Sequence, residues 1–261
     1  MAVLGIITCE ILELEFARLL GEDAEVARIT ILEDSHSEQL IRLLKQRQVP
    51  LRCLPHPHAF AAEPGDSLEL LVRVLALGLH RNQRVLRDAL AKAAQEMRSS
   101  IDALLLGYGL CGGALDDARA VLDVDLPLFQ PMDGERPVDD CVALCLGGRE
   151  RYYGEQRKCA GTFFLTPGWS RHWRRMLDLR SGQVSQPGLQ RLLSGYQRAL
   201  LVCTPVLAED ELQRRGDDFV RHTGLRLETQ TGTLAPLRAA WEAAKAVVRS
   251  KSVFNTAEGI R

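Results

Sequence analysis

Residues 101–113 read IDALLLGYGLCGG, a short apolar run followed at once by a glycine-rich turn. An apolar run of this length, closed by glycine, is typical of a strand that is buried on both faces of a sheet. Similar runs occupy 3–8 (VLGIIT), 27–32 (ARITIL), 162–166 (TFFLT) and 199–204 (ALLVCT). These stretches therefore predict core strands of a mostly parallel sheet.

Helical patterns separate the predicted strands. The spacing of apolar residues predicts helices over 37–45, 82–99 and 236–248, and a further helix over 67–79. Strands that alternate with helices indicate an α/β fold with helices on both faces of the sheet. A chain of 261 residues has room for two domains, so we expect two Rossmann-like lobes around a cleft.

The predicted boundary between the lobes lies just before the glycine-rich stretch. Residues 1–100 form the expected N-terminal α/β lobe, which includes a loop rich in proline and histidine near 49–66. Residues 101–261 form the expected core lobe, with the Gly-Tyr-Gly-Leu-Cys-Gly turn and a C-terminal helix.

Composition narrows the class of partner. The 33 Lys and Arg residues are balanced by 34 Asp and Glu residues, which removes the basic footprint expected of a nucleic-acid binder. No apolar stretch is long enough to span a membrane, and the N-terminus lacks the basic region of a signal peptide. We therefore expect a cytoplasmic protein without nucleic-acid or membrane partners.

The chain contains seven cysteines, an odd number. In a cytoplasmic protein such cysteines are free thiols, metal ligands or catalytic thiols rather than a disulfide framework. Cys9, Cys111 and Cys203 each follow a predicted strand, and Cys141 begins a predicted helix over 141–146. Because sites in open α/β sheets form at the carboxyl ends of the strands, these cysteines are candidate site residues.

The glycines around Cys111 predict a turn that a ligand can approach closely. The strand over 162–166 also ends in a turn, Thr-Pro-Gly-Trp, at the same expected edge of the sheet. The candidate cofactor-binding residues are Gly107, Gly109, Gly112, Thr166 and Trp169.

Thiols and an imidazole at the strand ends suit a soft metal ion. The candidate ligands are Cys9, His80, Cys111 and Cys141. This donor set favours zinc, with an iron–sulfur cluster or a corrinoid as the alternatives. The candidate catalytic residues are Cys141, Tyr108 and Glu10.

Cys141 has a specific expected role. A helix N-terminus favours a thiolate, so we expect a lowered pKa for Cys141, with Asp139 or Asp140 as the helix cap. Tyr108 would donate a proton, and Glu10 would orient the ligands.

A basic run follows Trp169. Arg171, His172, Arg174 and Arg175 lie close together in a predicted helix and have the chemistry to clamp a phosphate or a carboxylate. The pattern favours the other interpretation, a solvated helix face above packed tryptophans.

Three stretches resemble one family, the domain of unknown function 1638. They are LGYGLCG at 106–112, DCVALCLGGRERY at 140–152 and GTFFLTPGW at 161–169, and Cys9-Glu10 and LHRN at 79–82 are similar to its other motifs. The resemblance implies a place beside corrinoid-dependent methyltransferase systems. It therefore implies a corrinoid protein or methyltransferase as partner and a small-molecule methyl donor.

These observations lead to one main hypothesis and three alternatives. The main hypothesis is a metal- or cofactor-binding protein with a Cys/His site, acting as an enzyme or accessory factor in corrinoid-linked methyl (one-carbon) transfer. The alternatives are a non-catalytic module that binds a corrinoid or a partner protein, an iron–sulfur enzyme that uses Cys9, Cys111 and Cys203, and a metal-free enzyme with Cys9 and Cys111 on opposing lobes.

Overall fold

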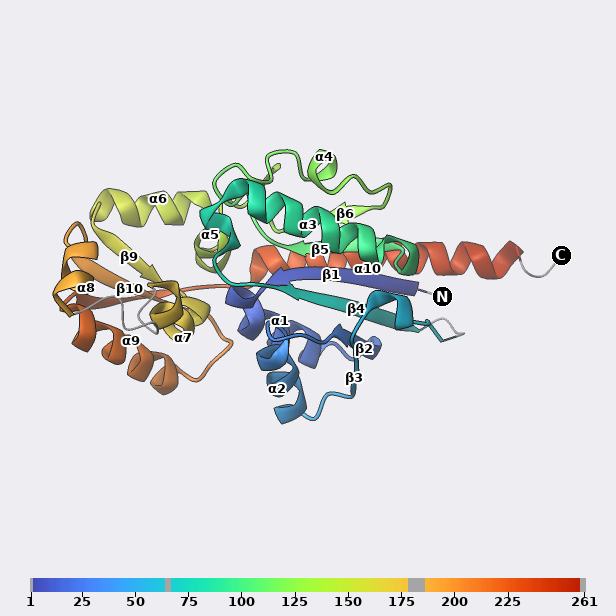
Figure 1. Ribbon diagram of the computed structural model, residues 1–261, viewed down its shortest axis with the longest axis horizontal. Helices are drawn as coiled ribbons and strands as arrows, with labels where there is room; N and C mark the ends of the chain where they lie inside the picture. Colours follow the sequence, from blue (N-terminus) through green and yellow to red (C-terminus); the bar gives the residue numbers. More distant parts are fainter. Residues whose placement is uncertain (1, 64–66, 178–185, 259–261) are drawn as a thin grey trace.

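The computed structural model describes residues 2–63, 67–177 and 186–258. Its strands and helices alternate along the chain, and two parallel sheets lie one after the other along the long axis of the molecule (Figure 1). The α/β class predicted from the sequence is confirmed. The further expectation, of two separate lobes around a cleft, stays a prediction.

The larger sheet consists, within the described residues, of six parallel strands in the order β3-β2-β4-β1-β5-β6. The central strand β1 pairs with β4 on one side and with β5 on the other, and side chains on both of its faces are buried because helices cover both. The strands are β1 (Ala2–Cys9), β2 (Val26–Leu32), β3 (Leu51–Leu54), β4 (Leu68–Leu75), β5 (Ala103–Gly107) and β6 (Leu128–Phe129).

Helices cover both faces of this sheet. In Figure 1, α3 (Gln83–Met97) and α4 (Ala118–Leu122) lie above the strands, and α1 (Glu13–Glu22) and α2 (Glu38–Gln46) lie below. The long helix α10 (Ala235–Glu258) packs against β1 and β5. The C-terminal part of the chain therefore returns to the first sheet.

The smaller sheet has, in the described ranges, three parallel strands in the order β11-β10-β9. These strands are β9 (Thr162–Leu165), β10 (Arg198–Cys203) and β11 (Arg226–Thr231), and the helices beside them are α7 (Pro167–Met176), α8 (Gln186–Leu192) and α9 (Glu209–Thr223). Phe163, Trp173 and Phe219 form a buried aromatic group in a core that is separate from the core of the larger sheet.

Short elements join the two sheets. A single 3₁₀ turn (Glu10–Leu12) follows β1, and α5 (Cys141–Leu146) and α6 (Arg149–Lys158) lead from the larger sheet to the smaller one. A small antiparallel pair, β7 (Met132–Asp133) with β8 (Arg136–Pro137), precedes α5. As β1 and β5 run toward the smaller sheet, their carboxyl ends lie in the middle of the molecule (Figure 1).

Two expectations from the sequence differ from the structure. Residues 67–79, predicted as a helix, contain β4, because LELLVRVL is apolar at both helical and strand spacing and the strand is buried on both faces. The predicted boundary at residue 100 divides one sheet, because β5 and β6 pair beside β1. None of the helices in the described ranges combines the length and hydropathy that a membrane span needs.

Candidate functional site

Cys9 is the last residue of the central strand. Its side chain is buried beside the first residues that follow β5, since the parallel register places Thr8 opposite Gly107. Burial removes the thiolate from water and raises the pKa of Cys9 to about 11, and the charges of Glu10 and Glu13 add to the rise. At neutral pH Cys9 is therefore a thiol in this structure.

Cys111 lies in the glycine-rich turn after β5. Its backbone adopts φ of +47°, which a non-glycine residue rarely does, and its N–H donates to Asp139 O at 2.8 Å. Burial, followed by the charges of Cys9 and Asp140, raises the pKa of the Cys111 thiol to about 12. A strained backbone held by a second segment positions this thiol, and such strain is concentrated at functional sites.

Cys141 is the first residue of α5. The predicted cap is confirmed, because Asp140 Oδ1 accepts hydrogen bonds from the N–H groups of Val142 and Ala143 at 2.9 and 2.8 Å. The predicted fall in the pKa of Cys141 is wrong. Burial raises this pKa well above its usual range, and the charge of Asp140 adds to the rise, so both outweigh the helix N-terminus.

The three thiols form one group, which we call the thiol cluster (Cys9, Cys111 and Cys141). Cys9 acts electrostatically on Cys111, and both act on Cys141. The cluster therefore joins residues from β1, from the turn after β5 and from α5. No group of three or more His, Cys, Asp or Glu side chains stands ready to hold a metal ion in the described parts of the chain.

His80, the fourth predicted ligand, lies at the rim of this group. It belongs to a 3₁₀ turn (Leu79–Arg81) after β4, and its side chain is exposed to solvent. Desolvation and the Arg81 guanidinium lower the pKa of His80, while the charge of Asp140 acts in the opposite direction. The structure therefore brings His80 into electrostatic contact with the residue that caps the Cys141 helix.

Two tyrosines face the cluster, and the sequence pointed to one of them. Tyr108 is buried. Its hydroxyl interacts with the Cys9 thiol, but it forms no hydrogen bond of normal geometry with the residues described. Tyr152 in α6 was missed; burial and then the charge of Asp140 raise its pKa to about 12, with a further contribution from Cys141. Tyr152 lies in the stretch 140–152, which resembles the family, and this position was the sequence signal for it.

A buried carboxyl group lies behind the cluster. Glu15 in α1 is fully buried, and Cys145 Sγ donates to its Oε1 at 3.8 Å, while Oε2 has no hydrogen-bond partner among the residues that the structure describes. Burial and the charge of Glu13 raise the pKa of Glu15 to about 8, and its charge also acts on Cys141. The signal for this group in the sequence is the set of three glutamates, Glu10, Glu13 and Glu15, within an apolar run.

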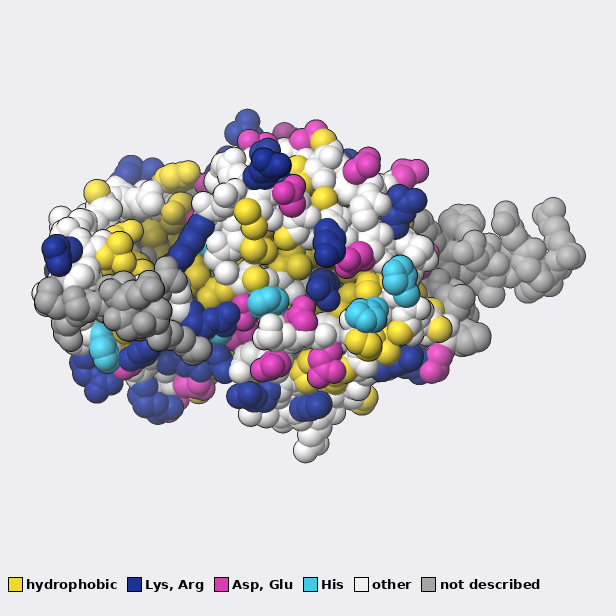
Figure 2. Space-filling model, viewed as in Figure 1, with side chains coloured by type: hydrophobic (Ala, Val, Ile, Leu, Met, Phe, Trp, Pro, Cys, Tyr) yellow, Lys and Arg dark blue, Asp and Glu magenta, His cyan; other side chains and the backbone are white. Residues whose placement is uncertain are grey.

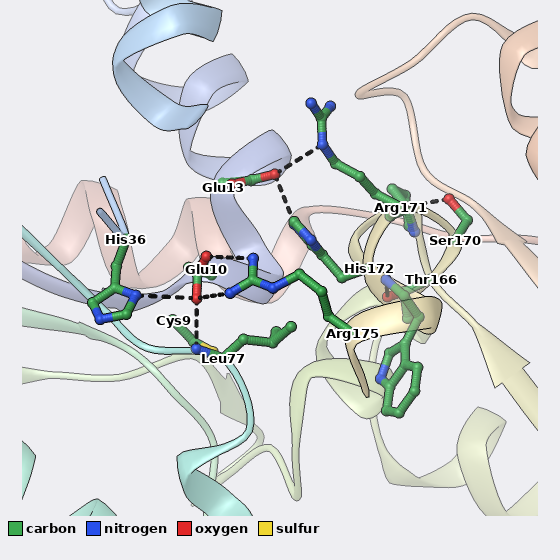
Figure 3. A network of polar contacts seen from close by, with 12 residues as sticks. Cys9, Glu10, Glu13, His36, Leu77, Thr166, Ser170, Arg171, His172 and Arg175 are labelled. Atoms are coloured by element: carbon green, nitrogen blue, oxygen red, sulfur yellow. Dashed lines mark hydrogen bonds and ion pairs between the residues drawn. The ribbon is translucent and has the colours of Figure 1, made fainter. Parts of the chain in front are cut away.

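Glu10, a predicted catalytic residue, is held by ion pairs. Its oxygens accept from Arg175 at 2.8 and 3.1 Å and from the N–H of Leu77 at 2.7 Å, with the His36 ring 3.5 Å away (Figure 3). Glu13 pairs similarly with His172 at 2.9 Å and Arg171 at 3.2 Å. These pairs connect the end of β1 with α7.

The predicted cofactor-binding residues contact protein. A Cβ atom at Gly109 would lie 2.3 Å from Val138 O, so this glycine permits two backbone segments to meet, and Gly107 likewise packs against Phe16. Gly112 has φ of +70° in the turn. Thr166 caps α7, and Trp169 packs edge-on against Phe163 at 5.4 Å.

Cys203 is not part of the thiol cluster. It ends β10 in the smaller sheet, and its pKa is raised by burial and by Glu209, with no contribution from the cluster thiols. Cys9 and Cys111 do not oppose each other across two lobes, because they follow neighbouring strands of one sheet.

The fold and the site define an α/β protein with one buried and two half-buried thiols at the carboxyl ends of a parallel sheet. The profile of a family described as "Protein of unknown function (DUF1638)" matches residues 74–241, more than half of the chain. The chain belongs to this family, in agreement with the resemblance noted above. No curated protein and no solved structure matches it.

Proposed function

We propose that the thiol cluster binds a thiophilic metal ion, zinc(II) in the first place, and that the protein works in methyl (one-carbon) transfer. One observation carries the proposal. Three elements that are distant in sequence bring Cys9, Cys111 and Cys141 within electrostatic range of one another. Beyond the effect of burial, Cys9 contributes to the raised pKa of Cys111, and both contribute to the raised pKa of Cys141.

The chemistry of the donor set fits such an ion. Thiolates select zinc and other soft metals, and a cation among three thiols replaces mutual repulsion with attraction. His80 would supply a nitrogen ligand from the rim, and Asp140 would orient it. The buried Tyr108 hydroxyl, which interacts with the Cys9 thiol, is a further polar group available to a ligand. Binding requires the thiol side chains to turn toward one another, because they do not stand at ligand spacing.

The raised pKa values argue against a metal-free thiol enzyme. A catalytic cysteine works as a thiolate and needs a lowered pKa, whereas Cys9, Cys111 and Cys141 all have raised values. A cation is the simplest means of deprotonating them at neutral pH. The placement of Cys203 likewise does not favour a cluster that uses it with Cys9 and Cys111.

The chemistry of the site and the resemblance to the family both support a role in methyl transfer. A thiolate-bound zinc ion would act as a Lewis acid that activates a thiol or a methyl donor. The resemblance to family 1638 implies a corrinoid protein or methyltransferase as partner. The protein would then be either the enzyme itself or an accessory factor that binds its partner without turnover.

A cobalt(II) titration of metal-free protein tests the metal proposal. Thiolate-to-cobalt charge-transfer absorption reports directly on sulfur ligands. We expect it to saturate near one equivalent in the wild type and in Cys203→Ser, the matched control outside the cluster, and to be lost in Cys111→Ser. Equal absorption in Cys111→Ser and the wild type, or no absorption in either, would overturn the proposal.

A second experiment separates catalysis from binding. The loaded protein is mixed with a corrinoid protein and a methylated amine, and methylcobalamin formation is followed by absorbance. Turnover that disappears in Cys111→Ser supports an enzyme, and a stoichiometric complex without turnover supports an accessory factor. If neither turnover nor a complex is found, the proposed role in methyl transfer is wrong, and only the proposal of a metal-binding protein remains.

A further inference from the structure

Two adjoining cavities lie between the larger and the smaller sheet, away from the thiols of the cluster. The first has a volume of about 510 Å³ and lies between α2, α7 and α9. The second, of about 310 Å³, shares Gln39, Arg42 and Arg171 with it and is also lined by Glu10 and Glu38. We call the first one the arginine groove, after its four arginines: Arg42, Arg47, Arg171 and Arg215.

The arginine groove carries more positive than negative charge. Four guanidinium groups line it, and Glu211, which pairs with Arg215, is the lining carboxylate. The side chain of Arg42 forms no ion pair or hydrogen bond with any residue in the described ranges, and among them the guanidinium of Arg47 donates only to Leu43 O. Two positive charges in the groove are therefore without a counter-ion in the part of the chain that the structure describes.

Donor groups in the groove are unused. Arg171 meets Glu13 through Nε, and its two terminal nitrogens point away from that carboxylate (Figure 3). Arg215 Nη1 is buried and has no hydrogen-bond partner in the described part of the chain. A buried donor without a partner is unfavourable because it has lost its hydrogen bonds to water, and a bound acceptor would restore one.

The neighbouring arginines also act on one another. Desolvation lowers the pKa of Arg171, and the charges of Arg215 and Arg42 lower it further. Figure 2 shows Lys and Arg side chains gathered where the parts of the molecule that carry α2 and α9 face each other. An anion placed there relieves this repulsion.

We propose that the arginine groove binds a small phosphate-bearing ligand. Guanidinium groups match the oxygens of a phosphate in paired hydrogen bonds, and the dianion balances the two uncompensated charges. The groove has the volume of a small-molecule site. The adjoining cavity has two lining carboxylates, Glu10 and Glu38, and Arg175 there is already paired with Glu10. The groove has one, Glu211, so we place the phosphate in the groove itself. The proposal is independent of the metal proposal.

Calorimetric titration with pyrophosphate tests this site. We expect saturable binding by the wild type that weakens with added salt, and about tenfold weaker binding by Arg42→Gln. Arg42 is exposed and unpaired, so its substitution leaves the fold intact. Arg214→Gln is the matched control, because Arg214 neighbours Arg215 on α9 and does not line the groove.

The outcomes are distinct. Tighter binding of pyrophosphate than of succinate, weakened about tenfold in Arg42→Gln and kept in Arg214→Gln, supports a phosphate site. No saturable binding by the wild type, equal binding by Arg42→Gln, or equal binding of succinate would overturn the proposal. None of these results bears on metal binding, which is read by cobalt absorption.

Discussion

At the scale of single residues, burial controls the chemistry of the site. Cys9 and Cys111 have pKa values raised to about 11 and about 12, mainly because their thiolates would lose contact with water. The sequence identified these residues through their positions after strands. It did not identify the direction of the pKa shift at Cys141, because that depends on how deeply α5 is buried and not on its N-terminus.

Proton release on metal binding follows from these pKa values. Because the three cluster thiols are protonated at pH 7.5, zinc binding should release roughly one proton per thiolate ligand. The measurement is calorimetry in two buffers with different ionisation enthalpies. An identical apparent enthalpy in both buffers would mean that the ligands are not these thiols.

Glu15 makes stability depend on pH in an unusual direction. Its folded pKa of about 8 lies above the ordinary glutamate value of 4.5, so the folded protein retains a proton that the unfolded chain has lost between these values. The free energy of unfolding should therefore fall as pH rises through this window, on the order of 1.4 kcal/mol per unit. Glu15→Gln mimics the protonated group and should remove this slope.

Urea denaturation at pH 5 and pH 8 measures the effect. The stability of Glu15→Gln relative to wild type should increase from pH 5 to pH 8. An equal difference at both pH values would show that Glu15 is ionised in the folded protein.

At the scale of elements, close backbone contacts fix the geometry. A Cβ atom at Gly168 would lie 1.8 Å from Ile11 O, so this glycine permits α7 to pack on the 3₁₀ turn after β1. The sequence showed a Pro-Gly pair at a turn and gave no indication of this contact, which depends on two distant segments.

Gly168→Ala should therefore destabilise the protein by about 1–3 kcal/mol through steric overlap with the backbone. Gly154→Ala is the control, because the added Cβ would meet only the flexible end of Arg157, at 4.0 Å, among the described residues, and α6 gains helix propensity. Thermal denaturation of both variants measures the effect. Similar melting temperatures would contradict the contact.

How well a strand could be predicted from the sequence depended on its pattern of buried residues. The sequence predicted β1, β2, β5 and β10 within two residues, because their apolar runs are short and bounded by polar or glycine residues. It mistook β4 for a helix, because a strand buried on both faces lacks the alternation that would identify it.

At the scale of the whole molecule, ion pairs link the end of β1 to the second core. Glu10 is buried and bound by two nitrogens of Arg175 in α7. Sequence reasoning placed the basic run on a solvated face, since only the fold shows that α7 meets the carboxyl end of β1. The same helix supplies Arg171 to the arginine groove.

Arg175→Met should leave the Glu10 carboxylate buried without its cation and cost about 1–3 kcal/mol in the free energy of unfolding. The double variant Glu10→Gln/Arg175→Met should recover part of this loss, because it removes the unpaired charge. Chemical denaturation of the wild type, the single variant and the double variant measures these differences in the free energy of unfolding. A single variant as stable as wild type would show that the pair contributes nothing.

The most direct test of the central claim is elemental analysis by plasma mass spectrometry. The protein is purified without oxygen and without a His tag, and Cys111→Ser is purified alongside it. The account predicts near-stoichiometric zinc, with iron or cobalt as the alternative elements, in the wild type and its loss in the variant. Absence of all three metals from wild-type protein that also fails to take up zinc would contradict it.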